Sequence, residues 1–253
     1  KALNIGAPTI ASKVYDGTTA AGGVTVGALS GLVSPETLTV SGTADAYSSA
    51  AVGTYSGVAV TYTLANGGSG NTAGLASNYS LAAGSASGTI TGRPLTVTDV
   101  AVTSKAYDGT TSAVITGTLS GVMNSDDVTL VGTGTFASKN VGANQVVTST
   151  STLSGLAAGN YTLTQPTGLT GTITAKALSI GAPTIASKVY DGTTAAGAVT
   201  VGALTGLVGS EILTVTGTAA AYSSAAVGTY DNVAVTYTLA NGGSGNTAGL
   251  ASN

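Results

Sequence analysis

The 253-residue sequence contains no cysteine, no histidine and no tryptophan, and only 7% of its residues are charged. Cysteine and histidine are the commonest ligands of transition metals, and histidine is the usual general base of enzymes. Seven Lys/Arg and ten Asp/Glu residues leave few groups that could activate a Ser, Thr or Tyr nucleophile. These absences predict a protein that is not an enzyme and that holds no cofactor.

Positive charge and long apolar runs are also scarce. A net charge of −3 and a pI of about 4.5 do not supply the basic surface that binds nucleic acid. No run approaches the roughly 18 apolar residues of a membrane span, so we expect none. No charged segment followed by an apolar run marks a signal peptide, so an export signal would have to precede Lys1. The absence of cysteine fits an exported bacterial protein without disulfides, and it fits a reducing cytosol equally well.

The residues that are abundant favour strands, and they are arranged in repeats. Thr, Val, Gly, Ser and Ala dominate, whereas helix-favouring Glu, Lys, Gln, Arg and Met are rare. Residues 1–78 and 176–253 align without gaps and differ at only ten positions. A divergent copy lies between them. We therefore expect three domains, at 1–92, 93–175 and 176–253, whose junctions leave no room for a flexible linker and so predict an extended, semi-rigid rod.

A Lys-x-Tyr-Asp-Gly-Thr-Thr motif opens each repeat. We interpret it as a structural turn: Asp accepts local backbone hydrogen bonds, Gly supplies a positive φ, and Tyr packs at the edge of the domain. The Lys three residues before the Asp is expected to form an ion pair with it or to pack on the Tyr. The motif residues are Lys13, Tyr15, Asp16 and Gly17; Lys105, Tyr107, Asp108 and Gly109; and Lys188, Tyr190, Asp191 and Gly192.

Each repeat has the size of a β-domain with about seven short strands. Residues 58–64 alternate large apolar with small or polar side chains, which is typical of a half-buried strand. Further strands are expected at 38–40, 128–130, 233–239 and in the segment that ends at Ile90. We predict tandem antiparallel, Ig-like β-sandwich domains, with a parallel β-helix as the alternative.

The third repeat, at 176–253, is nearly identical to the first and stops before the segment that would form its last strand. A sandwich without that strand would expose an unpaired edge and a groove. A strand from another chain could fill the groove by β-augmentation, or the segment is simply one part of a longer array.

The motif, together with Phe136-Ala137-Ser138-Lys139-Asn140-Val141-Gly142 and the Asn160-Tyr161-Thr162-Leu163 ending, resembles the YDG-type repeat domains of filamentous-haemagglutinin-like adhesins. The resemblance covers essentially the whole chain. It implies a very large protein exported to the surface of Gram-negative bacteria or secreted, whose repeats extend an adhesive tip or build a filament. Repeats 1 and 3 lack the Lys-Asn pair, so its role is open.

The resulting hypothesis is a structural stalk or filament segment of an extracellular adhesin. Its partners would be further copies of the repeat in the same or neighbouring chains, possibly by strand complementation. The alternative is a module whose loops bind a host or matrix glycan or protein. At three other sites a structural role is favoured over a chemical one: a Lys-to-Asn cross-link using Lys13, Asn78 and Glu36; calcium at Asp126 and Asp127; and glycosylation at Asn78 and Asn160.

Overall fold

The computed structural model describes all 253 residues and confirms the all-β prediction, since strands and short 3-10 turns are its only regular elements. The chain forms two compact units, each described by itself. The first comprises Lys1–Val100, Gly117–Gly132 and Ser151–Pro166, and the second comprises Ala101–Thr116, Thr133–Thr150 and Thr167–Asn253. Each unit thus contains one whole terminal repeat and part of the middle repeat.

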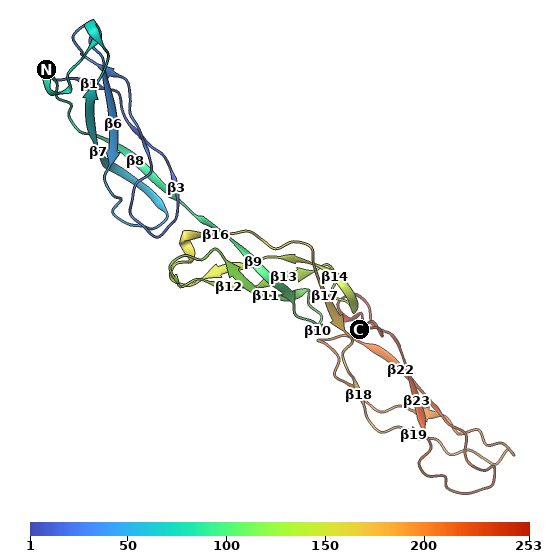
Figure 1. The fold of residues 1–253 in the computed structure, drawn as a ribbon. Coiled ribbons are helices and arrows are strands. Elements are labelled where there is room, and N and C mark those ends of the chain that lie inside the picture. The colour runs from blue at the N-terminus through green and yellow to red at the C-terminus, as the bar shows by residue number, and fades with distance from the viewer. The chain divides into compact units, whose positions relative to one another are not determined.

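Repeat 1 forms a curled, mixed sheet with strand order β3-β8-β7-β6 (Figure 1). Its long strands pair antiparallel, β6 with β7 and β7 with β8, whereas the short β3 pairs parallel to β8. The elements of repeat 1 are β1 (Asn4–Ile5), β2 (Thr9–Ile10), β3 (Lys13–Val14), β4 (Val24–Thr25), β5 (Leu29–Ser30), β6 (Leu38–Ala44), β7 (Gly53–Asn66), η1 (Gly70–Thr72), η2 (Ala76–Asn78) and β8 (Gly84–Thr91).

The parallel pairing of β3 and β8 places the motif turn at the end of repeat 1 that adjoins the next repeat. Lys13 lies opposite Ile90 and Val14 opposite Thr91, so both strands run towards the same end of the repeat. The motif turn therefore begins where the chain leaves β8 and enters the next repeat. A register shift between Tyr55 and Val58 marks a bulge in β7, which bends the sheet.

The core of the first unit continues from repeat 1 into the middle repeat. Tyr15, Tyr47, Val58 and Ile90 form one buried cluster with Leu95 and Tyr161 of the middle repeat. Burial along β7 alternates around Val58 and Val60, as the sequence pattern predicts for a half-buried strand. Because apolar side chains of both repeats share one cluster, the junction is part of the hydrophobic core.

The middle repeat supplies strands to both units. In the second unit β10 pairs parallel to β17 with Lys105 opposite Ile173, which repeats the pairing of β3 with β8. In the first unit β16 pairs parallel to β9. Its elements are β9 (Arg93–Val102), β10 (Lys105–Ala106), β11 (Ser112–Ser120), β12 (Thr129–Val131), β13 (Thr133–Phe136), β14 (Gly142–Ser149), β15 (Thr152–Ser154), η3 (Ala158–Asn160), β16 (Tyr161–Leu163) and β17 (Leu169–Thr174).

Repeat 3, in the second unit, has one shorter strand than repeat 1 and no counterparts of β3 and β8. Its β23 begins at Val235, the equivalent of Val60, whereas β7 begins seven residues earlier, at Gly53. The missing half is the part that pairs with β8 in repeat 1. The elements are β18 (Ser179–Ile180), β19 (Thr184–Ile185), β20 (Val199–Thr200), β21 (Leu204–Thr205), β22 (Leu213–Ala219), β23 (Val235–Asn241) and η4 (Gly245–Thr247).

A glycine in β8 allows an aromatic ring to lie directly on the strand. A Cβ atom at Gly88 would lie 2.2 Å from the Tyr47 hydroxyl and 2.5 Å from the ring. We therefore expect Gly88→Ala to lower the free energy of unfolding by about 1–3 kcal/mol through overpacking. Gly23→Ala is the control, because a Cβ at Gly23 would meet no atom within 4 Å and repeat 3 already has Ala198 there. Denaturant unfolding of both variants tests this; equal losses would contradict it.

Candidate functional site: the tyrosine–carboxylate junctions

The motif turn is held by its own aspartate. Asp16 Oδ1 lies 2.8 Å from Lys13 Nζ and accepts hydrogen bonds from the Thr18 backbone N–H at 2.9 Å and the Thr18 hydroxyl at 2.8 Å. Gly17 has a φ of 75°, which glycine adopts without strain. The other two motifs have the same arrangement: Lys–Asp distances are 2.8 Å at both, and φ is 77° at Gly109 and 75° at Gly192.

The ion pair and the threonine hydrogen bonds lower the pKa of the three motif aspartates to about 2, with the lysine as the largest cause. A carboxyl group with a lowered pKa in the folded state stabilises the fold above its ordinary pKa of 3.8, and this contribution is lost as the pH falls towards 2.

We therefore expect thermal stability to fall between about pH 4 and pH 2. The loss should be smaller in a variant with Asp16→Asn, Asp108→Asn and Asp191→Asn, since its three turns no longer titrate. Thermal melts at pH 7, 4 and 2.5 check this. A triple variant that loses as much stability as the wild type over that interval would show that the turns do not contribute.

The turn presents its tyrosine to the next repeat. Tyr15 is only 6% exposed, and its ring meets Tyr161 of the middle repeat edge to face, with centroids 5.4 Å apart and an interplanar angle of 75°. Such geometry is favourable for two aromatic rings. Tyr15 therefore packs outside its own repeat, against the first residue of β16 in the middle repeat.

Two tyrosines share one carboxylate oxygen at this junction. Asp126 Oδ2 accepts a hydrogen bond from the Tyr15 hydroxyl at 2.8 Å and another from the Tyr161 hydroxyl at 2.6 Å. The Tyr161 hydroxyl also accepts one from the Met123 backbone N–H at 3.0 Å. Burial, and then the hydrogen bond to Asp126, raise the pKa of Tyr15 to about 12. The neutral hydroxyl is therefore the form that the junction stabilises.

The asparagine before Tyr161 adds a second contact. Asn160 Oδ1 accepts a hydrogen bond from the Val52 backbone N–H of repeat 1 at 3.0 Å. The Asn-Tyr pair therefore has a structural role, because both residues contact the preceding repeat. In repeat 1 the corresponding tyrosine, Tyr79, donates to Glu36, which is the positional equivalent of Asp126.

The second unit contains an equivalent junction with one addition. Tyr107 donates its hydroxyl to Glu211 of repeat 3, and the Val141 backbone N–H donates to Asn253 Oδ1 at 3.0 Å. Burial, and then Glu211, raise the pKa of Tyr107. Lys139 Nζ also lies 3.9 Å from Glu211 Oε1.

The Lys-Asn pair of the middle repeat therefore acts at this junction. Besides the contact of Lys139 with Glu211, Asn140 Oδ1 accepts a hydrogen bond from Asn253 Nδ2 at 3.1 Å. In repeat 1 the aligned residues are Ala50 and Ala51, which can form neither contact. The two junctions thus share a tyrosine–carboxylate contact and differ in the polar contacts around it.

The third motif has the same turn, but its tyrosine is exposed. Tyr190 is 65% exposed, in contrast to Tyr15 at 6% and Tyr107 at 3%. In the first two repeats the motif tyrosine is buried where it contacts the next repeat. The turn forms in all three repeats, because the Lys188–Asp191 pair is intact as well.

Sequence reasoning identified the motif residues but missed their acceptors. One carboxylate at equivalent positions of each repeat, Glu36, Asp126 and Glu211, was the available signal in a chain with so few charges. The structure does not bring the proposed cross-link residues together, because Lys13 pairs with Asp16 and Glu36 with Tyr79.

Neither a metal site nor a membrane helix is found in the structure. No group of three or more carboxylates is placed to hold a metal ion. Asp127, one of the two calcium candidates, accepts a hydrogen bond from the Leu156 backbone N–H at 3.1 Å. No helix has the length and apolar character to cross a bilayer.

Comparison with known families agrees with the repeat pattern. The model of the YDG domain matches residues 1–87, 91–168 and 174–249, which together cover nearly the whole chain. No curated protein and no solved structure gives a significant match. The matched segments each contain one Lys-x-Tyr-Asp-Gly-Thr-Thr motif, the same motif whose tyrosine and turn form the junctions. The chain belongs to the YDG domain family as three tandem repeats.

Proposed function

We propose that the chain is a structural stalk segment of a large extracellular bacterial adhesin. The observation that supports this is the junction: each motif tyrosine that has a following repeat donates its hydroxyl to a carboxylate of that repeat. A buried contact of this kind resists bending more than a flexible linker does. Repetition of one such joint lengthens the protein without any new recognition chemistry.

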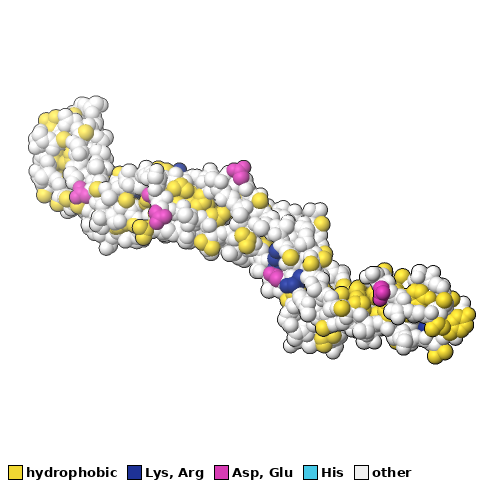
Figure 2. Space-filling model, turned by 90° about the horizontal axis from the view of Figure 1, so that it is seen from below, with side chains coloured by type: hydrophobic (Ala, Val, Ile, Leu, Met, Phe, Trp, Pro, Cys, Tyr) yellow, Lys and Arg dark blue, Asp and Glu magenta, His cyan; other side chains and the backbone are white.

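The surface supports the same proposal. Charged side chains are few and scattered over the face seen in Figure 2, with no dense patch of either sign. Such a surface offers little to steer a charged ligand. Secretion or display at the cell surface belongs to the same proposal. So does an Ig-like sandwich for each complete repeat, built from mixed rather than purely antiparallel sheets. Alternating burial in β6 and β7 favours packed sheets.

Light scattering combined with negative-stain electron microscopy of the purified segment tests the proposal. We expect monomeric, elongated particles with three domains in a row. A compact particle would contradict a stalk. Saturable binding to a glycan array that is lost on loop substitution would also contradict it, because the chain would then be a recognition module. Regular filaments would support the filament form of the same structural role.

A further inference from the structure

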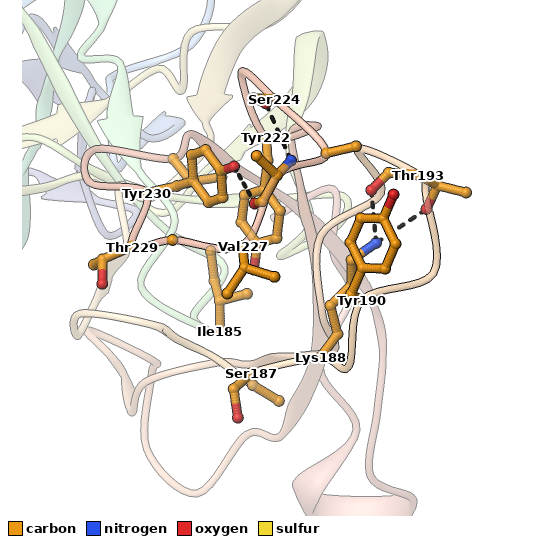
Figure 3. A pocket seen from close by; sticks show the side chains of 15 residues that line it. Ile185, Ser187, Lys188, Tyr190, Thr193, Tyr222, Ser224, Val227, Thr229 and Tyr230 are labelled. Atoms are coloured by element: carbon orange, nitrogen blue, oxygen red, sulfur yellow. Dashed lines mark hydrogen bonds between the residues drawn. The ribbon is translucent and has the colours of Figure 1, made fainter.

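The repeats have two kinds of donor end, by which we mean the motif turn together with the turn at 49–51, 138–140 or 224–226. These second turns have the sequences Ser-Ala-Ala, Ser-Lys-Asn and Ser-Ala-Ala. Their backbone is the same, because the third residue donates its N–H to the serine Oγ at 3.1 Å in each of them (Figure 3 shows the turn of repeat 3). Two side chains therefore distinguish the Lys-Asn donor end from the Ala-Ala donor ends.

The acceptor ends, which carry the carboxylate, are also of two kinds. The carboxylate is Glu36 in repeat 1, Asp126 in the middle repeat and Glu211 in repeat 3. The neighbouring asparagine does not distinguish them, because Asn160 and Asn253 each accept a backbone N–H of the preceding repeat at 3.0 Å. In this chain the Ala-Ala donor end of repeat 1 meets an aspartate, whereas the Lys-Asn donor end meets a glutamate.

The Lys-Asn donor end fits the longer carboxylate. Lys139 Nζ lies 3.9 Å from Glu211 Oε1, and the glutamate side chain is only 13% exposed. An aspartate in its place would draw the carboxylate back by one C–C bond, about 1.5 Å, and this contact would lengthen beyond an ion pair. Asn140 Oδ1 accepts the second contact, from Asn253 Nδ2 at 3.1 Å. An alanine turn would leave the glutamate without its cation and that amide without its acceptor.

The Ala-Ala donor end fits the shorter carboxylate. Asp126 Oδ2 already accepts hydrogen bonds from Tyr15 at 2.8 Å and Tyr161 at 2.6 Å. The turn lies close by, since a Cβ atom at Gly17 would clash with the Asn124 side chain. A glutamate at this position would carry its carboxylate about 1.5 Å further into these contacts. The fit would be crowded, and no lysine of repeat 1 would compensate for it.

We propose that the junctions are selective for the order of the repeats. Lys139 and Asn140 determine that a repeat of the middle kind is followed by a glutamate acceptor, and Asp126 determines that it is preceded by an Ala-Ala donor end. Specificity of this kind is a difference between matched and mismatched pairs, and mismatched charges contribute to it. Repeats of the two kinds therefore alternate. This inference concerns pairing alone and holds whether or not the chain serves as a stalk.

Substitutions at the first junction of the 253-residue chain test the proposal. Hydrogen exchange of the Val52 amide, measured by NMR, reports on this junction because that N–H donates to Asn160 across it. We expect Asp126→Glu to lower the protection factor of this amide about tenfold. Adding Ala50→Lys and Ala51→Asn should recover at least about threefold of the loss, whereas the same pair should recover nothing in a chain that keeps Asp126.

The second junction repeats the test in the opposite direction. The Val141 amide is its reporter, since its N–H donates to Asn253. Glu211→Asp should lower protection of this amide about tenfold in the wild-type background. After Lys139→Ala and Asn140→Ala have removed the matching side chains, the same change should cost less than about threefold.

Two controls separate selectivity from loss of fold. Each junction reports on the other, because substitutions at the first should leave the Val141 amide unchanged. Amides in the pairing of β6 with β7 should stay protected in every variant at the first junction; if Asp126→Glu unfolds them, the second junction decides. The proposal is overturned if the Lys-Asn pair changes Val52 protection equally with Asp126 and with Asp126→Glu. It is also overturned if Glu211→Asp costs the same with and without Lys139 and Asn140.

Discussion

Replacing Tyr15 by alanine is expected to lower the free energy of unfolding of the first unit by about 3–5 kcal/mol, which is the usual cost of removing a buried aromatic side chain. Tyr15 is 6% exposed, packs against Tyr161 and donates to Asp126, so the change removes both ring contacts and a hydrogen bond. Denaturant unfolding, monitored through hydrogen exchange of amides in repeats 1 and 2, measures the loss in free energy of unfolding.

The chain carries its own control for this substitution. Tyr190 occupies the same turn but is 65% exposed, so Tyr190→Ala should change stability by no more than about 0.5 kcal/mol. Tyr15→Phe keeps the ring and removes only the hydroxyl; we expect a loss of about 1.5–3 kcal/mol, since the acceptor is charged. If Tyr15→Ala and Tyr190→Ala cost the same, the tyrosine acts within its own turn and the junction contributes nothing.

Phe136→Ala is expected to destabilise the second unit by a similar amount, about 3–5 kcal/mol. Phe136 is the only phenylalanine of the chain and is 2% exposed. Its ring lies against Gly171 of β17, and its backbone N–H donates to Thr111 O at 2.7 Å, so it links the motif to the last strand. The substitution leaves a cavity where the ring was, and Gly171 has no side chain that could fill it.

Val114→Ala provides the comparison, because Val114 lies in the neighbouring strand β11 and is 59% exposed. Its loss should stay within about 0.5 kcal/mol. Thermal unfolding of both variants, monitored by circular dichroism, separates them. Comparable melting temperatures for Phe136→Ala and the wild type would mean that the ring is not part of the core.

Much of the fold follows from local patterns in the sequence. The alternation along residues 58–64 predicts the strand that the structure has in β7, and Asp16 with Gly17 predicts the turn. The direction of paired strands cannot be predicted in this way, because a two-residue period does not tell whether neighbouring strands run parallel or antiparallel. The parallel pairing of Lys13 with Ile90 joins residues 77 apart, and only the folded sheet reveals it.

The sequence predicts one half of the candidate site, the tyrosine, but not the carboxylate that accepts its hydrogen bond. Tyr15 stands out through its repeated motif, but its acceptor Asp126 lies 111 residues away and in another repeat. Nothing near Asp126 distinguishes it locally from Asp127, which accepts from the Leu156 N–H instead. Contacts between repeats depend on how one domain end meets the next, and the sequence of either repeat alone does not encode that.

The central claim is that the tyrosine–carboxylate contact makes the junction stiff, and a distance distribution tests it most directly. The absence of cysteine allows a spin label at each end of the junction, through Ser56→Cys in repeat 1 and Ser120→Cys in the middle repeat, both exposed. Electron–electron double resonance should give one narrow distribution, and Asp126→Ala should broaden it by removing the shared acceptor. A broad distribution in the wild type, unchanged by Asp126→Ala, would contradict the claim.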